Sequence, residues 1–326
     1  MRTPANRAAA ALMCLGLLAS TSVHAQSFPS KPVHIVVGFA AGGPTDVIAR
    51  VVAQDMTASL GQTVVVENRP GANAIIATEY VARAAPDGYT TLFSSLSLLV
   101  NAILSPGKIK YEPFRDFAPI SNGALLPMVI VTRPSTPVNS LQELIALAKR
   151  RPGEVTYGSA GHGGSAHLAG AMLEALGKVK MTHVSFRGNA PALVDVMAGQ
   201  VTFMFYPIIG ISEYVSGGKL KALAIGTEQR HADFPGVPTM QEAGYPGLAN
   251  TAPWVGLLAP AGTPGAIVNK LSEEMRKSLA KPETAARLRQ LGAVKVGDTP
   301  EQFLAFLKQD YERWTGVVKA ADVRPE

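Results

Sequence analysis

Residues 33–61 read VHIVVGFAAGGPTDVIARVVAQDMTASLG. The β-branched run at the start is typical of a buried strand, and a loop with two adjacent glycines follows it. Four apolar residues then stand four positions apart: Ile48, Val52, Met56 and Leu60. This spacing predicts a helix over Asp46–Leu60 that ends at Gly61. A strand, a glycine loop and a helix in this order are typical of the start of an α/β domain.

The same order of elements recurs along the chain. TVVVEN at residues 63–68 precedes a helical stretch near residues 75–83, and residues 89–93 form the next predicted strand. A second series begins after Pro119. It starts with the strand MVIVT, a helix from the capping box at Ser140 to Arg150, a strand at 155–159 and a helix from a Ser165 cap to Gly177. The strand MTHVSF, a helix near 190–197 and the strands VTFMF and LKALAIG follow. Such alternation implies parallel sheets, so we expect two α/β domains.

The C-terminal third returns to a strand, WVGLLAP at residues 254–260, and then to three predicted helices over 264–279, 283–291 and 300–318. The last helix carries one apolar stripe: Phe303, Leu307, Tyr311, Trp314 and Val318. A partner surface is one interpretation of this stripe. Because its spacing is what burial requires, we expect core packing instead.

The first 26 residues form the three-part pattern of a secretory signal peptide. Arg2 and Arg7 give a basic start, residues 8–18 are apolar, and small residues predict cleavage after Ala25. The apolar run is shorter than the roughly 20 residues that cross a bilayer. We therefore expect a soluble periplasmic protein, secreted through a cleavable signal peptide, and no integral membrane protein.

Composition narrows the classes of function. The chain has 326 residues, of which 47% are hydrophobic and 17% charged, so it is not a largely disordered protein. Its single Cys, Cys14, follows Met13, which is too large for a lipoprotein cleavage site. Cleavage removes Cys14 and lowers the formal net charge from +6 to +4, because two arginines are lost. A mildly basic exported chain without a thiol argues against nucleic acid as a partner and favours anionic small molecules.

Two glycine loops, each between a predicted strand and a predicted helix, are the sharpest local features. They read AAGGPTD at residues 40–46 and AGHGGS at residues 160–165. The first turn of a helix offers unpaired N–H groups and a partial positive charge, and anions bind there. An ordinary turn with Thr45 or Asp46 as the N-cap explains the first loop equally well. One such loop in each domain predicts a ligand cleft at the carboxyl ends of the strands.

Enzyme signatures are missing from the sequence. It has no G-x-G-x-x-G in register for a dinucleotide, no G-x-x-x-x-G-K-S/T phosphate loop and no G-x-S-x-G elbow. His162 and His167 are five positions apart and do not share a helix face as metal ligands would, so we expect His167 to bond locally. Asp46 and Asp195 are candidates for paired acid–base work, but capping explains Asp46. We expect no enzyme activity, no cofactor and no metal site.

Six longer segments extend these patterns over most of the mature chain. They are KPVHIVVGFAAGGPTDVIAR, GQTVVVENRPGANAIIATEYVARAAPDGYTTLF, YGSAGHGGSAHLAGAML, HVSFRGNAPALVDVMAGQVTFMF, GKLKALAIGTEQRHADFPGVPTMQEAGYPG and WVGLLAPAGTP. In order and spacing they resemble the substrate-binding receptors of tripartite tricarboxylate transporters, the TctC-like or Bug (Bordetella uptake gene) family. The resemblance implies an α/β fold of the periplasmic-binding-protein type II, a Venus flytrap with a central ligand cleft. It places residues 26–124 and 251–326 in domain I and residues 125–250 in domain II, after a signal peptide of residues 1–25.

The resemblance also implies where a ligand lies. Such receptors typically bind a carboxylate through backbone amides of two facing loops, with ordered waters bridging other ligand groups. Carried over by position, the implicated residues are Ala41, Gly42, Gly43, Thr45 and Asp46 on one side and Ser159, Ala160, Gly161, Gly164 and Ser165 on the other, together with Asn101. The implied partners are a small organic acid and the membrane permease subunits of a tripartite tricarboxylate transporter. We expect the receptor itself to be a monomer.

Two departures from the family pattern bear on the ligand. The family often has Pro-Tyr where this chain has Ser185-Phe186, and often an Asp near Tyr206. With Phe39 and Trp254 nearby, Phe186 and Tyr206 would make the cleft more apolar. We therefore hypothesise a mono- or dicarboxylate with an aromatic or otherwise apolar body rather than a citrate-like one. A receptor that feeds a sensor kinase and an exported hydrolase on the same scaffold are the alternatives.

Overall fold

The structure is a computed structural model, and it describes residues 28–248, 251–320 and 323–324. The predicted signal peptide and its cleavage after Ala25 lie outside the described residues. Every described helix and strand belongs to one compact unit, residues 31–326. Within the described chain, no helix is both long enough and apolar enough to span a membrane.

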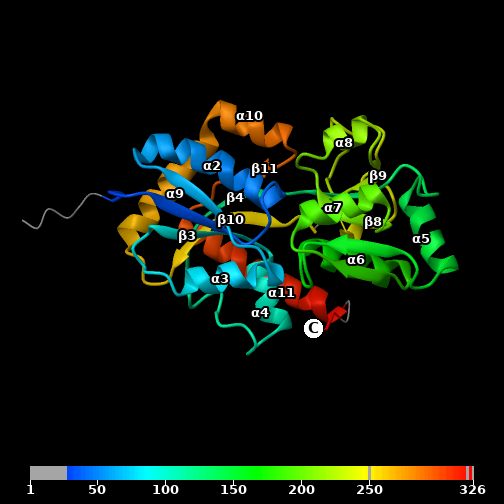
Figure 1. Cartoon of the computed structure of the whole chain (residues 1–326), viewed down its shortest axis with the longest axis horizontal. Coiled ribbons are helices and arrows are strands. Elements are labelled where there is room, and N and C mark those ends of the chain that lie inside the picture. Colours follow the sequence, from blue (N-terminus) through cyan, green and yellow to red (C-terminus); the bar gives the residue numbers. More distant parts are fainter. Residues whose placement is uncertain (1–27, 249–250, 321–322, 325–326) are drawn as a thin grey trace, which may run out of the picture. The chain divides into compact units, whose positions relative to one another are not determined.

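Two β-sheets organise residues 31–326 (Figure 1). The first has the strand order β11-β4-β10-β3-β1-β2 and the second the order β7-β6-β8-β5-β9. The strands of the first sheet are β1 (Val33–Val37), β2 (Val64–Asn68), β3 (Thr90–Ser95), β4 (Phe117–Leu125), β10 (Trp254–Pro260) and β11 (Val294–Lys295). Those of the second are β5 (Met128–Thr132), β6 (Thr156–Ser159), β7 (Thr182–Ser185), β8 (Phe203–Pro207) and β9 (Lys221–Ile225). We call the first sheet with its helices lobe I and the second sheet with its helices lobe II.

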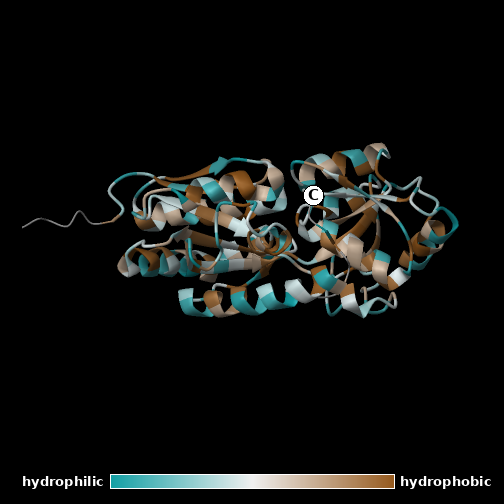
Figure 2. Cartoon of the chain, turned by 90° about the horizontal axis from the view of Figure 1, so that it is seen from below, coloured by the Kyte–Doolittle hydropathy of each residue, from teal (hydrophilic) through white to brown (hydrophobic). Residues whose placement is uncertain are grey.

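Helices cover both faces of each sheet, as an α/β domain requires (Figure 1). One face of the lobe I sheet is covered by α2 (Pro44–Leu60) and α9 (Gly265–Ala280), with α10 (Pro282–Gln290) beside α9. The other face is covered by α3 (Ile75–Ala82), α4 (Ser97–Leu104) and α11 (Pro300–Ala320). In lobe II, α5 (Leu141–Arg150) and α6 (Ser165–Gly177) cover one face, and α7 (Asn189–Ala198) and α8 (Ser212–Ser216) the other. Two short 3-10 turns complete the set, Ala72–Ala74 and Pro246–Leu248. In Figure 2 hydrophobic residues concentrate along the strands, which form the middle layer of each lobe.

The apolar stripe of α11 is part of the core. Phe303, Leu307 and Trp314 are at most 1% exposed, and Phe303 packs edge-to-face on Trp254 with ring centroids 5.4 Å apart. The predicted core packing of this helix is confirmed, and no partner is needed to explain its aromatic residues.

Both sheets are mixed, and this corrects the prediction of parallel sheets. β1 runs parallel to β2 and β3, but β10 is antiparallel to β3 and β4, and β5 is antiparallel to β8 and β9. The chain leaves lobe I through β4 and returns to it through β10. Because β10 enters from the end at which β4 leaves, the two neighbouring strands must run in opposite directions.

Two helix starts also differ from the prediction. α2 begins at Pro44 with Gly43 as its N-cap, so neither Thr45 nor Asp46 caps it. α6 begins at Ser165 with Gly164 as its N-cap. Pro44 has no N–H to satisfy at the first helical position, which allows α2 to start where its glycine loop ends.

Candidate functional site

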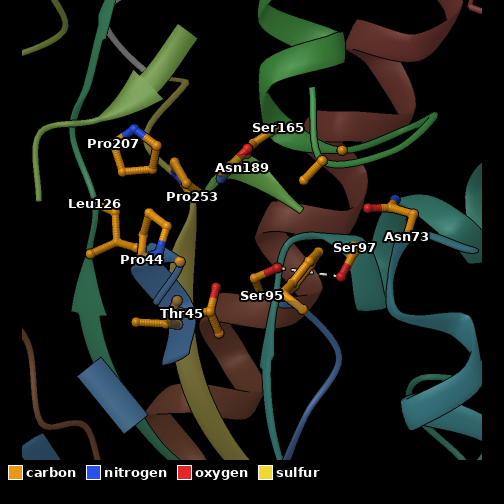
Figure 3. Close-up of a pocket in the computed structure, with 15 residues that line it drawn as sticks. Pro44, Thr45, Asn73, Ser95, Ser97, Leu126, Ser165, Asn189, Pro207 and Pro253 are labelled. Atoms are coloured by element: carbon orange, nitrogen blue, oxygen red, sulfur yellow. Dashed lines mark hydrogen bonds between the residues drawn. The ribbon is translucent and has the colours of Figure 1, made fainter. Parts of the chain in front are cut away.

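The amino ends of four helices meet at one cavity between the lobes. Its lining includes Thr45 of α2, Ser97 of α4, Ser165 of α6 and Asn189 of α7, each within the first two residues of its helix (Figure 3). The first N–H groups of a helix have no acceptor within the helix, and they carry the positive end of its dipole. Each of these helices follows a strand, namely β1, β3, β6 or β7. The cavity therefore lies where an open α/β sheet usually binds its ligand, and it offers donors from both lobes.

None of the 15 residues that line the cavity is charged. The remaining lining residues are Phe39, Gly43, Pro44, Asn73, Ser95, Leu126, Ala160, Gly164, Pro207, Pro253 and Val255. The volume is about 30 Å³, which is close to the share of one water molecule in the liquid. Sites for small organic ligands usually enclose about 300 Å³ or more. A small organic acid therefore needs more room than the cavity has in this arrangement of the lobes.

Asp46 shapes the first glycine loop from behind. Its buried carboxylate accepts hydrogen bonds from the Gly42 amide (2.9 Å), Arg50 Nε (3.0 Å) and Asn68 Nδ2 (2.8 Å). Burial alone raises the pKa of Asp46, but the bonds from Arg50, Gly42 and Asn68 outweigh it and hold the pKa below its ordinary value. The carboxylate thus stays ionised and fixes the loop, but it does not line the cavity.

Of the residues that we expected at the ligand in the first glycine loop, only some face the cavity. Gly43 and Thr45 line it, as does Phe39, whereas Ala41 and Gly42 are exposed. Since the Gly42 N–H already donates to Asp46, the donors left at this end belong to the first turn of α2.

The second glycine loop is held by its own hydrogen bonds. Ser159 Oγ, fully buried, donates to the Gly161 carbonyl oxygen (2.9 Å) and accepts from the Gly161 amide (3.2 Å). The Gly163 amide donates to Nδ1 of His167 (2.9 Å), which confirms that His167 bonds locally. Ala160, Gly164 and Ser165 remain on the cavity side. Ser159 and Gly161 therefore position this end of α6 rather than line the cavity.

Three histidines stack behind this loop. The ring centroids of His167 and His183 are 4.0 Å apart, and those of His162 and His167 are 4.5 Å apart. Burial, followed by repulsion from the neighbouring rings, lowers the pKa of His167 to about 3, and burial with repulsion from His162 lowers that of His183 to about 4. Both rings are therefore neutral near pH 7. Across the described residues, no group of three or more His, Cys, Asp or Glu side chains is arranged to hold a metal ion.

Ser159 also lies close to His183, with 2.6 Å between Ser159 Oγ and His183 Nε2. Either atom can supply the proton of this contact, because neutral imidazole has two tautomers. Neither residue lines the cavity. Asp46 is buried behind the first loop and Asp195 lies in the second half of α7; neither lines the cavity, so they form no acid–base pair there.

Asn101 acts through Asn73, a residue that the sequence analysis did not include. The two buried side chains pair, with Asn73 Nδ2 donating to Asn101 Oδ1 (2.9 Å) and Asn101 Nδ2 donating to the Asn73 carbonyl oxygen (2.9 Å). Asn73 lines both this cavity and a neighbouring one of about 680 Å³, whereas Asn101 lines only the neighbouring one, together with Gly161 and Phe186.

The structure corrects the expected positions of two aromatic residues. Tyr206 is 5% exposed in the lobe II core, where burial raises the pKa of its phenol. Trp254 is 1% exposed in the lobe I core, with Nε1 donating to Asp310 Oδ2 (3.0 Å). Of the four aromatic residues expected near the ligand, Phe39 alone lines the cavity.

We did not predict Ser97 and Asn189 from the sequence. Each nevertheless stands where a helix begins after a strand, the same pattern that identified the two glycine loops. Ser97 starts a helix directly after the strand TTLFSS, and Asn189 starts one after Ser185-Phe186-Arg187-Gly188. A strand followed at once by a helix places the helix amino end at the same edge of the sheet.

Known proteins share this architecture and much of this sequence. The family model "Tripartite tricarboxylate transporter family receptor" matches residues 48–323. BugT of Bordetella pertussis is 37% identical over 315 residues, which are 94% of this chain and 96% of BugT. The structure of the periplasmic binding protein BugD has a TM-score of 0.87 and 37% identity, and the match covers 92% of this chain and 100% of BugD.

Two further solved structures contain ligands. Rpa4515 of R. palustris, with adipate, has a TM-score of 0.88 and 32% identity over 92% of this chain and 100% of its own. MatC of Rhodopseudomonas palustris, with bound malate, has a TM-score of 0.85 and 34% identity over 89% of this chain and 100% of its own. On its sequence and its fold, the chain belongs to the tripartite tricarboxylate transporter receptor family, which includes the Bug proteins.

Proposed function

We propose that this chain is a periplasmic solute-binding receptor that captures a small organic carboxylate in the cavity between its lobes. The observation that carries the proposal is the convergence of four helix amino ends on a cavity without a charged side chain. Backbone N–H groups at helix starts are suited to a carboxylate, and they are fixed in place before the ligand arrives. The adipate and malate bound by two relatives belong to the same chemical class.

Binding proceeds by opening and closing of the lobes. In the closed arrangement Leu168 of α6 packs against Leu96, Val100 and Trp314 of lobe I. The ligand adds contacts from both lobes that exist only when they are closed, and this difference in contacts drives closure. No bond of the ligand needs to be made or broken in this process.

The ligand body we propose is small and aliphatic. The expected aromatic preference rested on Phe39, Phe186, Tyr206 and Trp254. Of these, Phe39 alone lines this cavity, Phe186 lines the neighbouring one, and the other two are buried in the lobe cores. Phe39 is left as one apolar wall, with prolines and Leu126 beside it. A short mono- or dicarboxylate fits this lining better than an aromatic acid.

The wider role is delivery of the acid to the permease of a tripartite tricarboxylate transporter. Export to the periplasm by residues 1–25 and a division into residues 26–124 with 251–326 and residues 125–250 belong to the same proposal. The strand composition of the two sheets supports this division, although β4 extends one residue past position 124. A receptor that feeds a sensor kinase would use the same cavity, and crosslinking to membrane partners separates the two roles.

A steric block tests the site. Gly43 lines the cavity with φ −76°, which any residue adopts, so Gly43→Leu adds bulk at the cavity wall without straining the backbone angle. The new Cβ would lie 3.2 Å from the Ala40 carbonyl oxygen, so the loop must shift by a few tenths of an ångström. Overpacking typically costs about 1–3 kcal/mol, which raises a Kd by about 5- to 150-fold. Gly236→Leu is the matched control, because a Cβ there meets no heavy atom within 4 Å. Calorimetric titration of the mature chain with succinate, malate and adipate gives the Kd values; an affinity that Gly43→Leu leaves unchanged would reject this cavity as the site.

A further inference from the structure

A buried amide oxygen without a partner faces the cavity. Asn73 is 7% exposed and lines the cavity, and its Oδ1 has no hydrogen-bond partner in the part of the chain that the structure describes. Figure 3 shows this oxygen on the side of the residue that faces Ser97. Leaving a buried acceptor unpaired costs free energy that a donor placed in the cavity would recover.

The hydrogen bonds around Asn73 fix which end of its amide faces the cavity. The Asn73 carbonyl oxygen can only accept, so Asn101 must turn its Nδ2 toward it. Asn101 Oδ1 then meets the Asn73 side chain and can only accept, so Asn73 must present Nδ2 to it. Reversing either amide sets two acceptors or two donors against each other. Oδ1 of Asn73 is therefore the end left for the cavity.

The backbone holds this oxygen against lobe II. Ala72, Asn73 and Ala74 have φ values of +47°, +48° and +69°, in the left-handed region that is costly for residues other than glycine. A methyl group on Gly161 would lie 3.0 Å from Asn73 Cβ, and one on Gly164 would lie 3.3 Å from Asn73 Oδ1. The strained turn thus brings one acceptor into contact with the second glycine loop.

A second amide oxygen lines the same cavity. Oδ1 of Asn189, at the start of α7, is buried and also unpartnered among the described residues. A bare carboxylate carries only acceptors, so it can satisfy the helix ends but cannot donate to either amide oxygen. A ligand with a hydroxyl group beside its carboxylate would satisfy the helix ends and supply a donor as well.

We infer that the ligand is a hydroxy acid, and that Asn73 Oδ1 selects it by accepting a hydrogen bond from the hydroxyl group. The inference rests on the proposed function and narrows its ligand class. A buried site that hydrogen-bonds a ligand hydroxyl discriminates against the analogue without it, here by about tenfold in Kd.

Pairs of acids that differ by one hydroxyl group test the inference. The probes are malate and succinate, citrate and tricarballylate, lactate and propionate, and 2-hydroxyadipate and adipate, titrated calorimetrically into the mature chain. Asn73→Gly removes the acceptor, and glycine adopts φ +48° without strain. Asn122→Ala is the matched control, because Asn122 is also a buried Asn with an unpartnered Oδ1 but does not line the cavity.

The expected result is a hydroxy acid that binds about tenfold tighter than its deoxy partner, with the ratio falling to about one in Asn73→Gly and unchanged in Asn122→Ala. Equal or tighter binding of the deoxy acid by the natural chain overturns the inference without any variant, and leaves the proposed function standing. A hydroxyl preference that persists in Asn73→Gly overturns the role of Asn73. If no acid in the panel binds, the proposed function fails and the inference fails with it.

Discussion

Acidification from pH 7 to pH 5 should destabilise this protein through two histidines behind the second glycine loop. His167 and His183 have pKa values lowered to about 3 and about 4 in the folded chain, because they are buried against each other and against His162. In the unfolded chain a histidine titrates near 6.5. Between these values the unfolded state binds more protons than the folded state, so the free energy of unfolding falls as the pH falls through this window.

The size of the effect follows from the width of that window. At pH 5 an unfolded histidine is 1.5 pH units below its ordinary pKa, and each unit is worth about 1.4 kcal/mol, so each ring contributes about 2 kcal/mol. The two rings together should remove about 4 kcal/mol of stability between pH 7 and pH 5. Burial raises the pKa of Glu174, so protonation of Glu174 increases the free energy of unfolding as the pH falls. All the variants compared keep Glu174, so this contribution is the same in each of them.

Neutral side chains that keep the hydrogen bonds make the test specific. Asn in place of His167 offers an oxygen near the position of Nδ1, which accepts from the Gly163 amide. Gln in place of His183 offers an amide group near the position of Nε2, which can either donate to Ser159 Oγ or accept from it. Urea unfolding at pH 7 and pH 5 gives the free energy of each protein. The double variant His167→Asn/His183→Gln should lose about 4 kcal/mol less on acidification than the natural chain. His34→Gln is the control, because His34 is exposed on β1; an equal acid loss in the natural chain and the double variant would refute the reasoning.

Two glycines give further predictions. Gly161→Ala should raise the Kd for the carboxylate by about tenfold or more relative to Gly153→Ala. Both glycines have positive φ, but only at Gly161 would the new Cβ meet the facing turn, at 3.0 Å from Asn73 Cβ. Equal Kd values in calorimetry would contradict this prediction. Gly170→Ala should cost about 1–3 kcal/mol in thermal or urea unfolding, since its Cβ would clash with the Tyr157 ring, whereas Gly316→Ala in α11 should stabilise by up to about 1 kcal/mol. Unchanged stability of Gly170→Ala would show that the Tyr157 ring moves aside at no cost.

Local features of the site were predictable from the sequence because their causes are local. The run of β-branched residues, the paired glycines and the four-residue spacing each act within one turn or one strand, and they gave the strand, the loop and the helix of residues 33–61. The same is true of the loop at residues 160–165 and of the buried stripe on α11. The predicted starts of α2 and α6 differ from the observed starts by one or two residues, because the Pro or Gly there allows the helix to begin at either position.

Other features depend on residues far apart in the sequence, and no local pattern reports them. The left-handed turn at Asn73 is held by Asn101, 28 positions away. The direction of β10 follows from the path of the chain through lobe II. Tyr206 and Trp254 are on strands next to the cavity, but side chains alternate between the two faces of a sheet, and both of these point into a core.

The most direct test of the central claim is a crystal structure of the mature chain with L-malate. We expect a carboxylate oxygen about 3 Å from the backbone nitrogens of Thr45 and Ser165, the distance of an N–H to O hydrogen bond, with no cationic side chain in contact. A carboxylate held instead by the side chain of Arg187 or Lys108 in the neighbouring cavity would contradict it.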